Sequence, residues 1–531
     1  MRILIKNGML YDGSGQRPRQ KNLLVEGDRI AAVTQQQDLN ADKVIDADGL
    51  MVTPGFIDTH RHCDIDALYH PDFGTVELAQ GLTTVIGGNC GLAPIPARKA
   101  HRKEIFDFIE PCLGAAPRQL QMERYCEYIE ELEARELPLH VGSYIGAGTL
   151  KAAIKGYGKS AFTRDEMEQA KTYIREGIEA GAVGLSMGLM YQPECYSSRE
   201  ELVELASCIA PYGRPLTCHI RGEGDNLVSS IKEIMEIAKQ AGVPLNISHF
   251  KATGVKNWGS AIHQAIELVE AARSGGQDVT VDFYPYCGGS TTLISLLPPS
   301  VIGESIEQTL ERLASVEGKE LLRRELYREH AGWDNMVTAI GWERILISSV
   351  NLENNRKYAG MNFKEAAGLA GYEEPSDFAC ELLVQERGKV SIIVLSMSQE
   401  DVDTVARLSY SMVISDALYG PGDCPHPRLY GAFPKIIREY VLERGVLTME
   451  EAIRKMTLLP AKRLSLEGRG MLKEGYYADI NLFRAEELRD YAVYDNPRRL
   501  CTGIRTSIIN GRIAVSQGEI KSRSCGRVIR L

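Results

Sequence analysis

The fold is decided by residues 227–283, which read LVSSIKEIMEIAKQAGVPLNISHFKATGVKNWGSAIHQAIELVEAARSGGQDVTVDF. Within this stretch two helical patterns alternate with two apolar strand patterns, in the order 227–238, 243–248, 262–272 and 279–283. The first helical pattern stops at Gly242, a residue that commonly ends helices. Helix and strand patterns that alternate in this way predict parallel strands joined by right-handed crossovers.

Two architectures are built from such units, a doubly wound open sheet and a closed (β/α)8 barrel. No glycine-rich nucleotide fingerprint follows a first strand in this sequence, and this favours the barrel. We therefore expect an α/β fold in which a TIM-like barrel spans residues 54–470. Between about residues 296 and 390 the pattern becomes helical and charged, which indicates an inserted helical segment near the late barrel strands.

The two ends of the chain differ from its middle, because both carry short strand patterns. Asn-Gly pairs at residues 7–8 and 510–511 are turn signals, and the second one joins two strand patterns into a hairpin. We expect residues 1–53 and 471–531 to form one small β-sandwich domain beside the barrel.

Composition places the chain among ordinary soluble globular proteins, with 25% charged and 44% hydrophobic residues and a net charge of -10. This balance predicts no nucleic-acid partner, and no apolar run is long enough to span a bilayer. Residues 1–8 lack the apolar core of a signal peptide, so we expect a cytoplasmic protein. The 12 cysteines have no regular spacing, which is typical of reduced thiols rather than a disulfide framework.

Histidines follow several of the predicted strands. The segment 54–62 reads PGFIDTHRH, in which His60 and His62 are two residues apart. In an extended strand, residues with this spacing lie on the same face. His219 and His249 also come directly after apolar strand runs. If these strands belong to one barrel, their carboxyl ends meet at one mouth, where imidazole nitrogens could hold zinc.

A cysteine and a carboxylate complete this predicted site. Cys90 follows the β-branched strand 83–86, and Asp416 follows the apolar run that ends at Ser415. Taken alone, Cys90 would usually be a buried thiol and Asp416 a cap or turn residue. Taken with the four histidines in strand order, they predict a mixed His, Cys and carboxylate metal site.

At this point the sequence resembles the D-aminoacylase (N-acyl-D-amino-acid deacylase) branch of the amidohydrolase superfamily over nearly its whole length. The motifs that carry the resemblance are PGFIDTHRH (54–62), GGNCG (87–91), GLSMGLMY (184–191), CHIR (218–221), SHFK (248–251), YPY (284–286) and PHPRLYG (425–431). The resemblance implies a hydrolase with a small-molecule N-acyl amino acid as its substrate.

The resemblance also implies roles for individual residues. It implies one tight Zn2+ held by Cys90, His219 and His249, and a weaker adjoining site at His60 and His62 that Cys90 bridges. Asp416 matches the family's catalytic aspartate, which would serve as general base and then as general acid. The positions that match the residues around the substrate's carboxylate are Lys251, Tyr284, Ser290 and Arg428, with Tyr191 nearby.

Independently of the resemblance, Arg428 and Lys251 have the chemistry that suits a carboxylate, and Lys251 shares strand parity with His249. The sequence departs from the family pattern at three places, with Cys63 after the histidine pair, Ala147 before Gly148 and Ala417 after Asp416. These residues border the predicted site and bear on the substrate range.

Two other functions remain open at this stage. A cyclic-amide hydrolase similar to hydantoinases or dihydroorotases typically bridges two metals with a carboxylated lysine, and residues 184–188 offer no lysine at the corresponding strand end. A non-catalytic relative that uses the fold as a scaffold usually loses ligands, whereas each expected ligand is present here.

Overall fold

A closed barrel of parallel strands forms the centre of the computed structural model, which describes residues 1–36, 38–117, 120–328, 330, 332–420, 422 and 424–531. Neighbouring strands pair in parallel in chain order, and β10 and β11 are two parts of one strand that pair with β9 and β12 respectively. The barrel strands are β8 (Phe56–Asp58), β9 (Leu82–Gly87), β10 (His140–Ser143), β11 (Ile145–Gly146), β12 (Leu185–Gly188), β13 (Leu216–His219), β14 (Leu245–Ile247), β15 (Val279–Phe283) and β19 (Ser411–Val413).

The barrel closes where the segment after β19 meets the segment after β8. The Asp416 backbone N–H donates to the His60 carbonyl at 2.9 Å, and the His62 N–H donates to the Ala417 carbonyl at 3.0 Å. These two bonds bring the first and last strands together at their carboxyl ends, and the predicted (β/α)8 barrel is confirmed.

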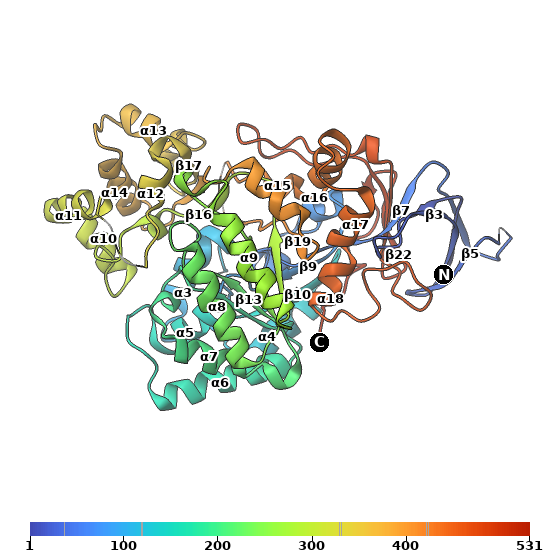
Figure 1. Ribbon diagram of the computed structural model, residues 1–531, viewed down its shortest axis with the longest axis horizontal. Coiled ribbons are helices and arrows are strands. Elements are labelled where there is room, and N and C mark those ends of the chain that lie inside the picture. Colours follow the sequence, from blue (N-terminus) through green and yellow to red (C-terminus); the bar gives the residue numbers. More distant parts are fainter. Residues whose placement is uncertain (37, 118–119, 329, 331, 421, 423) are drawn as a thin grey trace.

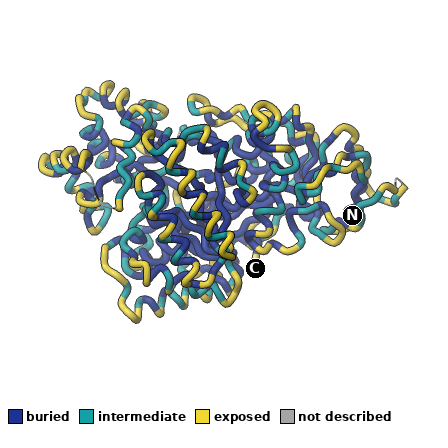
Figure 2. Tube along the Cα trace, in the orientation of Figure 1, coloured by how far each residue is buried: buried dark blue, intermediate teal, exposed yellow. Residues whose placement is uncertain are grey.

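Amphipathic helices cover the outside of the barrel, among them α6 (Arg164–Glu179), α7 (Arg199–Ser207), α8 (Leu227–Ala241) and α9 (Ala261–Ser274) (Figure 1). The predicted helix that stops at Gly242 is α8, because Gly242 takes a left-handed φ of 70° at its end. The buried faces of these helices share one apolar core with the barrel strands. Figure 2 shows this buried centre, with exposed residues along the outer turns of the helices.

Strands from both ends of the chain form a β-domain at one end of the molecule (Figure 1). β20 (Ile480–Phe483) pairs with β7 (Met51–Pro54), so the two termini meet inside one sheet. The other strands of that sheet are β2 (Met9–Leu10), β3 (Arg19–Gln20), β21 (Ile504–Ile509), β22 (Arg512–Ser516) and β23 (Glu519–Ile520). The second sheet consists of β1 (Arg2–Lys6), β4 (Asn22–Glu26), β5 (Arg29–Thr34) and β6 (Lys43–Asp46).

One apolar core joins these two sheets. It contains Ile3 of β1 and Val25 of β4 from one sheet, and Leu482 of β20 and Ile508 of β21 from the other. The predicted hairpin is β21 and β22, and both turn residues have positive φ, 53° at Asn510 and 71° at Gly511. The expected β-domain built from both termini is confirmed.

Most of the segment between β15 and β19, residues 289–394, forms a separate lobe at the opposite end of the molecule from the β-domain (Figure 1). Its helices are α10 (Ile306–Ala314), α11 (Val316–Leu326), α12 (Met336–Ile340), α13 (Phe363–Ala370) and α14 (Pro375–Gln385), and they enclose an apolar core of their own. The lobe also contains an antiparallel sheet of β16 (Gly289–Thr292), β18 (Ser391–Val394) and β17 (Ile345–Ser349). The sequence pattern indicated the helices but not this sheet, whose strands are short and lie far apart in the chain.

All 12 cysteines are free thiols, as their spacing predicted. Within the described ranges, none of the helices combines the length and the apolar character needed to cross a bilayer.

Candidate metal centre

Each residue predicted as a metal ligand lies at the carboxyl end of a barrel strand. His60 and His62 follow β8, Cys90 follows β9, His219 ends β13, and His249 follows β14. All five side chains are buried, the most exposed being His219 at 6%.

Sharp backbone turns direct three of the side chains at this end of the barrel. Cys90, His249 and Asp416 have positive φ angles of 54°, 37° and 51°, a region that residues other than glycine seldom adopt. Such strained backbone concentrates at functional sites, where it aims a side chain.

The ligand atoms fall into two groups that share the Cys90 sulfur. One group is His60, His62 and Cys90, the other is Cys90, His219 and His249, and within each group the ligand atoms lie within 4.8 Å of one another. Cys90 Sγ lies 3.2 Å from His60 Nε2 and 3.7 Å from His249 Nε2. The sulfur is therefore placed to serve two adjoining metal positions.

Several ring nitrogens of this cluster have no hydrogen-bond partner. Both nitrogens of His219 and the Nδ1 atoms of His60 and His62 are buried without one among the described residues. Buried polar atoms are normally satisfied, because an unpaired one loses the hydrogen bonds it made to water. Neutral imidazoles and a cysteine sulfur are the ligand types of zinc sites, so this donor set fits a zinc ion.

The electrostatics of the cluster also suit a cation. Burial lowers the pKa of His219 to about 3, so its imidazole is neutral and has a lone pair to offer. Burial and the Asp416 carboxylate raise the pKa of the Cys90 thiol well above its ordinary value. A bound cation would reverse this effect, because it stabilises the thiolate.

The Asp416 carboxylate lies between the histidine pair and an arginine. Its Oδ1 atom is 3.4 Å from the Nε2 atoms of both His60 and His62, and its Oδ2 atom is 2.9 Å from Nη1 of Arg428. Burial alone would raise the pKa of Asp416, but Arg428 and His60 together hold it well below its usual range. Asp416 is therefore an ionised, acceptor-only carboxylate.

A cavity of about 50 Å³ opens beside the cluster. Of the residues predicted around the substrate's carboxylate, Tyr191, Lys251, Tyr284 and Ser290 line this cavity, together with Asp416 and all the predicted metal ligands except His60.

Arg428 does not line this cavity but lies beside it. Its guanidinium carbon is 4.6 Å from the centre of the Tyr284 ring. The Tyr284 hydroxyl and the Arg428 nitrogens Nε and Nη2 are buried without hydrogen-bond partners among the described residues. These donors are available to an anionic group, whereas the Ser290 hydroxyl already donates to the Ile392 carbonyl at 2.9 Å.

Lys251 faces the mouth, as its parity with His249 predicted, but it has a partner that the sequence did not indicate. Its Nζ atom lies 2.6 Å from Glu223 Oε1 and 2.7 Å from His249 Nδ1. Glu223 Oε1 is in turn 2.9 Å from His249 Nδ1. Carboxylates that bind the outer nitrogen of a ligand histidine fix its tautomer and orientation, and here that leaves Nε2 of His249 facing the sulfur.

Glu223 is charged and buried. Burial opposes its ionisation, but Lys251, His219 and His249 lower its pKa below its usual range. Sequence reasoning missed this residue. The alternation of His219, Arg221 and Glu223 from the last residue of β13 onward indicated polar side chains on the face that carries His219.

A second missed network lies beneath the histidine pair. The Arg61 side chain is fully buried and donates to Asp58 at 3.3 Å, to Glu77 at 2.9 Å and to the Tyr419 hydroxyl at 2.9 Å. Asp58 Oδ1 also accepts 3.2 Å hydrogen bonds from the backbone N–H groups of His60 and Ser415. This network holds the first and last barrel strands in register beside the candidate metal ligands.

A comparison with known protein families matches the segments of the chain that contain these residues. A model of the amidohydrolase family matches residues 43–292 and 414–515. The first matched segment contains all five residues predicted as metal ligands, and the second contains Asp416 and Arg428.

The similar proteins include enzymes of known chemistry. The chain is 31% identical to a D-aminoacylase of Alcaligenes xylosoxydans xylosoxydans over 99% of this chain and 97% of that protein. A solved structure of an N-acyl-D-glutamate deacylase from Bordetella bronchiseptica, complexed with zinc and a phosphonate mimic of the tetrahedral intermediate, has a TM-score of 0.83 at 28% identity and covers 100% of this chain and 99% of that chain. A solved D-aminoacylase with a binuclear metal centre has a TM-score of 0.83 at 29% identity, with the same coverage.

Proposed function

Because the chain belongs to the amidohydrolase family, we propose that it hydrolyses the amide bond of N-acyl-D-amino acids and releases a carboxylate and a free D-amino acid. One observation carries the proposal more than any other, namely that Cys90 Sγ is shared by two His groups at the barrel mouth. The deacylases of similar sequence and structure support the same chemistry.

Cys90, His219 and His249 would hold the tight zinc ion, and His60 and His62 would hold a weaker one with Cys90 as the shared ligand. The orphan nitrogens of His219 support the first assignment. Bound zinc would supply a Lewis acid that polarises a carbonyl oxygen and lowers the pKa of a bound water to about 7.

Asp416 is the proton carrier of this proposal. Its Oδ1 atom faces the histidine pair, while Arg428 holds Oδ2 at 2.9 Å and fixes the orientation of the carboxylate. Asp416 takes a proton from the water that attacks the amide carbon, and then delivers this proton to the nitrogen of the leaving amino acid. A positioned carboxylate can perform both transfers, because the second restores the state it had before the first.

The substrate's α-carboxylate is bound by Arg428 Nε and Nη2 and by the Tyr284 hydroxyl, which have no hydrogen-bond partner in the described part of the chain. A guanidinium can grip a carboxylate through two parallel hydrogen bonds. The Lys251 ammonium adds positive charge nearby, although it also forms an ion pair with Glu223. Preference for the D enantiomer follows if the carboxylate, the scissile carbonyl and the side chain occupy three fixed positions.

The test is a panel of N-acetyl D- and L-amino acids, with the release of free amine as the readout. We expect zinc-loaded protein to act on the D series, and we expect both chelation and the D416N variant to remove this activity. Hydantoin turnover that exceeds deacylation would favour the cyclic-amide alternative. Equal deacylation by the wild type and D416N would sink the assignment of Asp416.

A further inference from the structure

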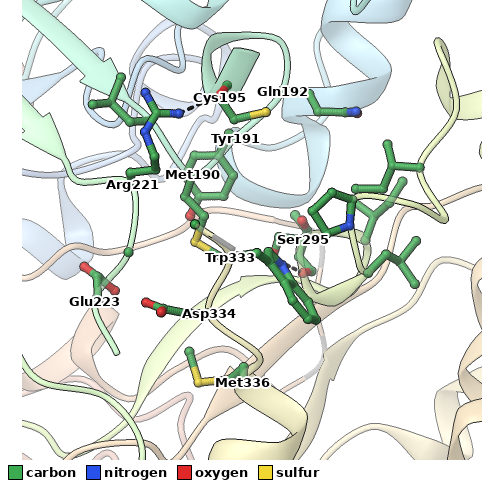
Figure 3. A pocket seen from close by; sticks show the side chains of 18 of the residues that line it. Met190, Tyr191, Gln192, Cys195, Arg221, Glu223, Ser295, Trp333, Asp334 and Met336 are labelled. Atoms are coloured by element: carbon green, nitrogen blue, oxygen red, sulfur yellow. Dashed lines mark hydrogen bonds between the residues drawn. The ribbon is translucent and has the colours of Figure 1, made fainter. Parts of the chain in front are cut away.

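A second, larger cavity adjoins the one beside the metal ligands. Its volume is about 260 Å³, and it shares Met190, Tyr191, Glu223, Thr253 and Met336 with the smaller cavity. Figure 3 shows this larger cavity, with Tyr191 and Glu223 on the barrel side and Trp333 and Met336 on the side of the inserted lobe. A substrate whose amide bond lies at the metal centre can therefore extend one substituent into it.

The walls of the larger cavity are mainly apolar. Met190 comes from the loop after β12, and Ile294, Leu297, Trp333 and Met336 come from the inserted lobe. Asp334 anchors this part of the lobe, because its carboxylate accepts hydrogen bonds from the backbone N–H groups of Gly224 at 2.6 Å and Asn226 at 2.9 Å. Trp333 is thereby held over the cavity by a contact with the loop that follows β13.

The charges that line this cavity are already paired. Arg221 is the cation among its described lining residues, and Nε and Nη2 of its guanidinium contact the Glu233 carboxylate at 3.0 to 3.3 Å. Its Nη1 atom donates to the Cys195 carbonyl at 2.6 Å. The two carboxylates on the wall, Glu223 and Asp334, also have partners, Lys251 and the backbone N–H of Gly224 respectively.

We propose that this cavity selects an uncharged, apolar substituent of the substrate and rejects an acidic one. The proposal rests on the deacylase function and adds the class of substrate to it. A second carboxylate in this cavity would lose its hydration beside Glu223 and Asp334 without meeting an unpaired cation among the described residues, and such burial is costly. A leucine-like side chain, or a longer acyl chain, would instead displace water from the apolar surfaces of Met190 and Trp333.

The proposal separates this chain from the N-acyl-D-glutamate deacylase that it resembles in fold. We expect kcat/KM for N-acetyl-D-leucine to exceed that for N-acetyl-D-glutamate and N-acetyl-D-aspartate by about 100-fold or more, because an ionised carboxylate buried without a partner is strongly disfavoured. An acidic substrate within about tenfold of the leucine substrate would overturn the selectivity. No turnover of any N-acyl-D-amino acid would instead overturn the deacylase function, and this proposal with it.

The W333A variant identifies the source of the apolar group, with Y327A as the matched control. Tyr327 belongs to the same lobe but is 59% exposed and does not line the cavity. One arm compares N-acetyl-D-leucine with N-acetyl-D-alanine, and the other compares N-hexanoyl-D-alanine with N-acetyl-D-alanine.

Loss of apolar contact in W333A should lower the ratio of kcat/KM for N-acetyl-D-leucine to kcat/KM for N-acetyl-D-alanine about tenfold or more, whereas Y327A should keep this ratio at its wild-type value. A loss in the first arm assigns the cavity to the amino-acid side chain. A loss in the second arm alone would assign it to the acyl chain and would overturn the predicted discrimination among side chains. W333A that behaves like Y327A on both arms would overturn the proposal.

Discussion

Two buried histidine sites lie at opposite ends of the same barrel, and their hydrogen bonding differs. At the carboxyl ends of the strands, both ring nitrogens of His219 lack a partner among the described residues. At the amino end, His140 begins β10, and its Nε2 atom lies 3.1 Å from Asp479 Oδ1 and 3.0 Å from Arg469 Nη1. Its Nδ1 atom accepts a 3.1 Å hydrogen bond from the backbone N–H of Arg527.

The comparison teaches that burial alone does not distinguish a structural histidine from a ligand. His140 is 0% exposed and His219 is 6% exposed, so the two side chains are similarly shielded from water. The partners of His140 come from the C-terminal part of the chain, so this histidine ties the barrel to the β-domain. The distinguishing feature is that ring nitrogens at the mouth have no hydrogen-bond partner among the described residues, whereas those of His140 do.

The largest expected effect comes from the C90A variant, which would break the site at the mouth. This change removes the sulfur shared by both groups of ligands, so we expect loss of tight zinc binding and of deacylation, with the fold retained. Zinc content of the purified variant, measured beside its thermal unfolding, checks the prediction. C90A protein that keeps the wild-type zinc content would contradict the assignment.

The D416N variant should leave the metal site intact but remove its proton carrier. We expect kcat to fall by about 1,000-fold, within the range of general acid-base contributions. Zinc binding should persist, because both proposed metal positions keep all their ligands. Single-turnover amine release and zinc analysis of the same sample separate the two effects, and a fall in kcat of less than about tenfold would argue against the assigned role.

The D479N variant tests the opposite end of the barrel. Burial raises the pKa of Asp479, but His140 and Arg469 together lower it below its usual range. The stability from this carboxylate is therefore present above the ordinary carboxyl pKa and is lost as pH falls through the lower value in the folded state. Removing the charge leaves the Arg469 guanidinium without its carboxylate partner. We therefore expect the free energy of unfolding, measured with urea at neutral pH, to fall by about 3 kcal/mol.

The matched control for D479N is D28N, in the same β-domain. Asp28 forms an exposed 3.4 Å ion pair with Arg527. This pair should contribute less than about 1 kcal/mol to the free energy of unfolding. Zinc affinity should remain at the wild-type value in both variants. Equal stability of D479N and D28N would show that the His140 site is not the structural counterpart that the comparison assumes.

The E223Q variant has the smallest expected effect and sharpens the comparison at the mouth. Glu223 binds the outer nitrogen of His249, and loss of such a contact typically weakens metal affinity by about 10- to 100-fold. Competition with a chelator measures this affinity directly. E233Q is the control, because Glu233 pairs with Arg221 and contacts no predicted ligand; equal zinc affinities in the two variants would refute the positioning role.

The sequence predicted the barrel and the placement of its strand-end residues because both depend on local pattern. His60, His62 and Lys251 do lie at the mouth. Their strands end at Asp58 and Ile247, however, so the backbone that follows each strand directs these side chains and strand alternation alone does not. The Glu223 contact was not predictable in this way, because it forms between two loops that follow different strands. The partner of His140 lies 339 residues away, a distance at which local pattern carries no information.

The inserted lobe shows a similar limit. Its helices have amphipathic patterns of their own, but β16 and β18 are four residues each and pair across about a hundred residues of chain. Trp333 lines the larger cavity beside Asp334, which binds the backbone of the loop at Gly224 and Asn226. No periodicity in the sequence encodes that contact.

Titration of metal-stripped protein with zinc tests the central claim most directly. Bound zinc and amine release from N-acetyl-D-leucine are measured in the same samples as zinc is added. We predict that deacylation rises with the first equivalent, as Cys90, His219 and His249 are filled, and that C90A protein shows no such rise. Full deacylation by the stripped protein, or an equal rise in C90A, would contradict the claim that the cluster at the barrel mouth is a catalytic metal centre.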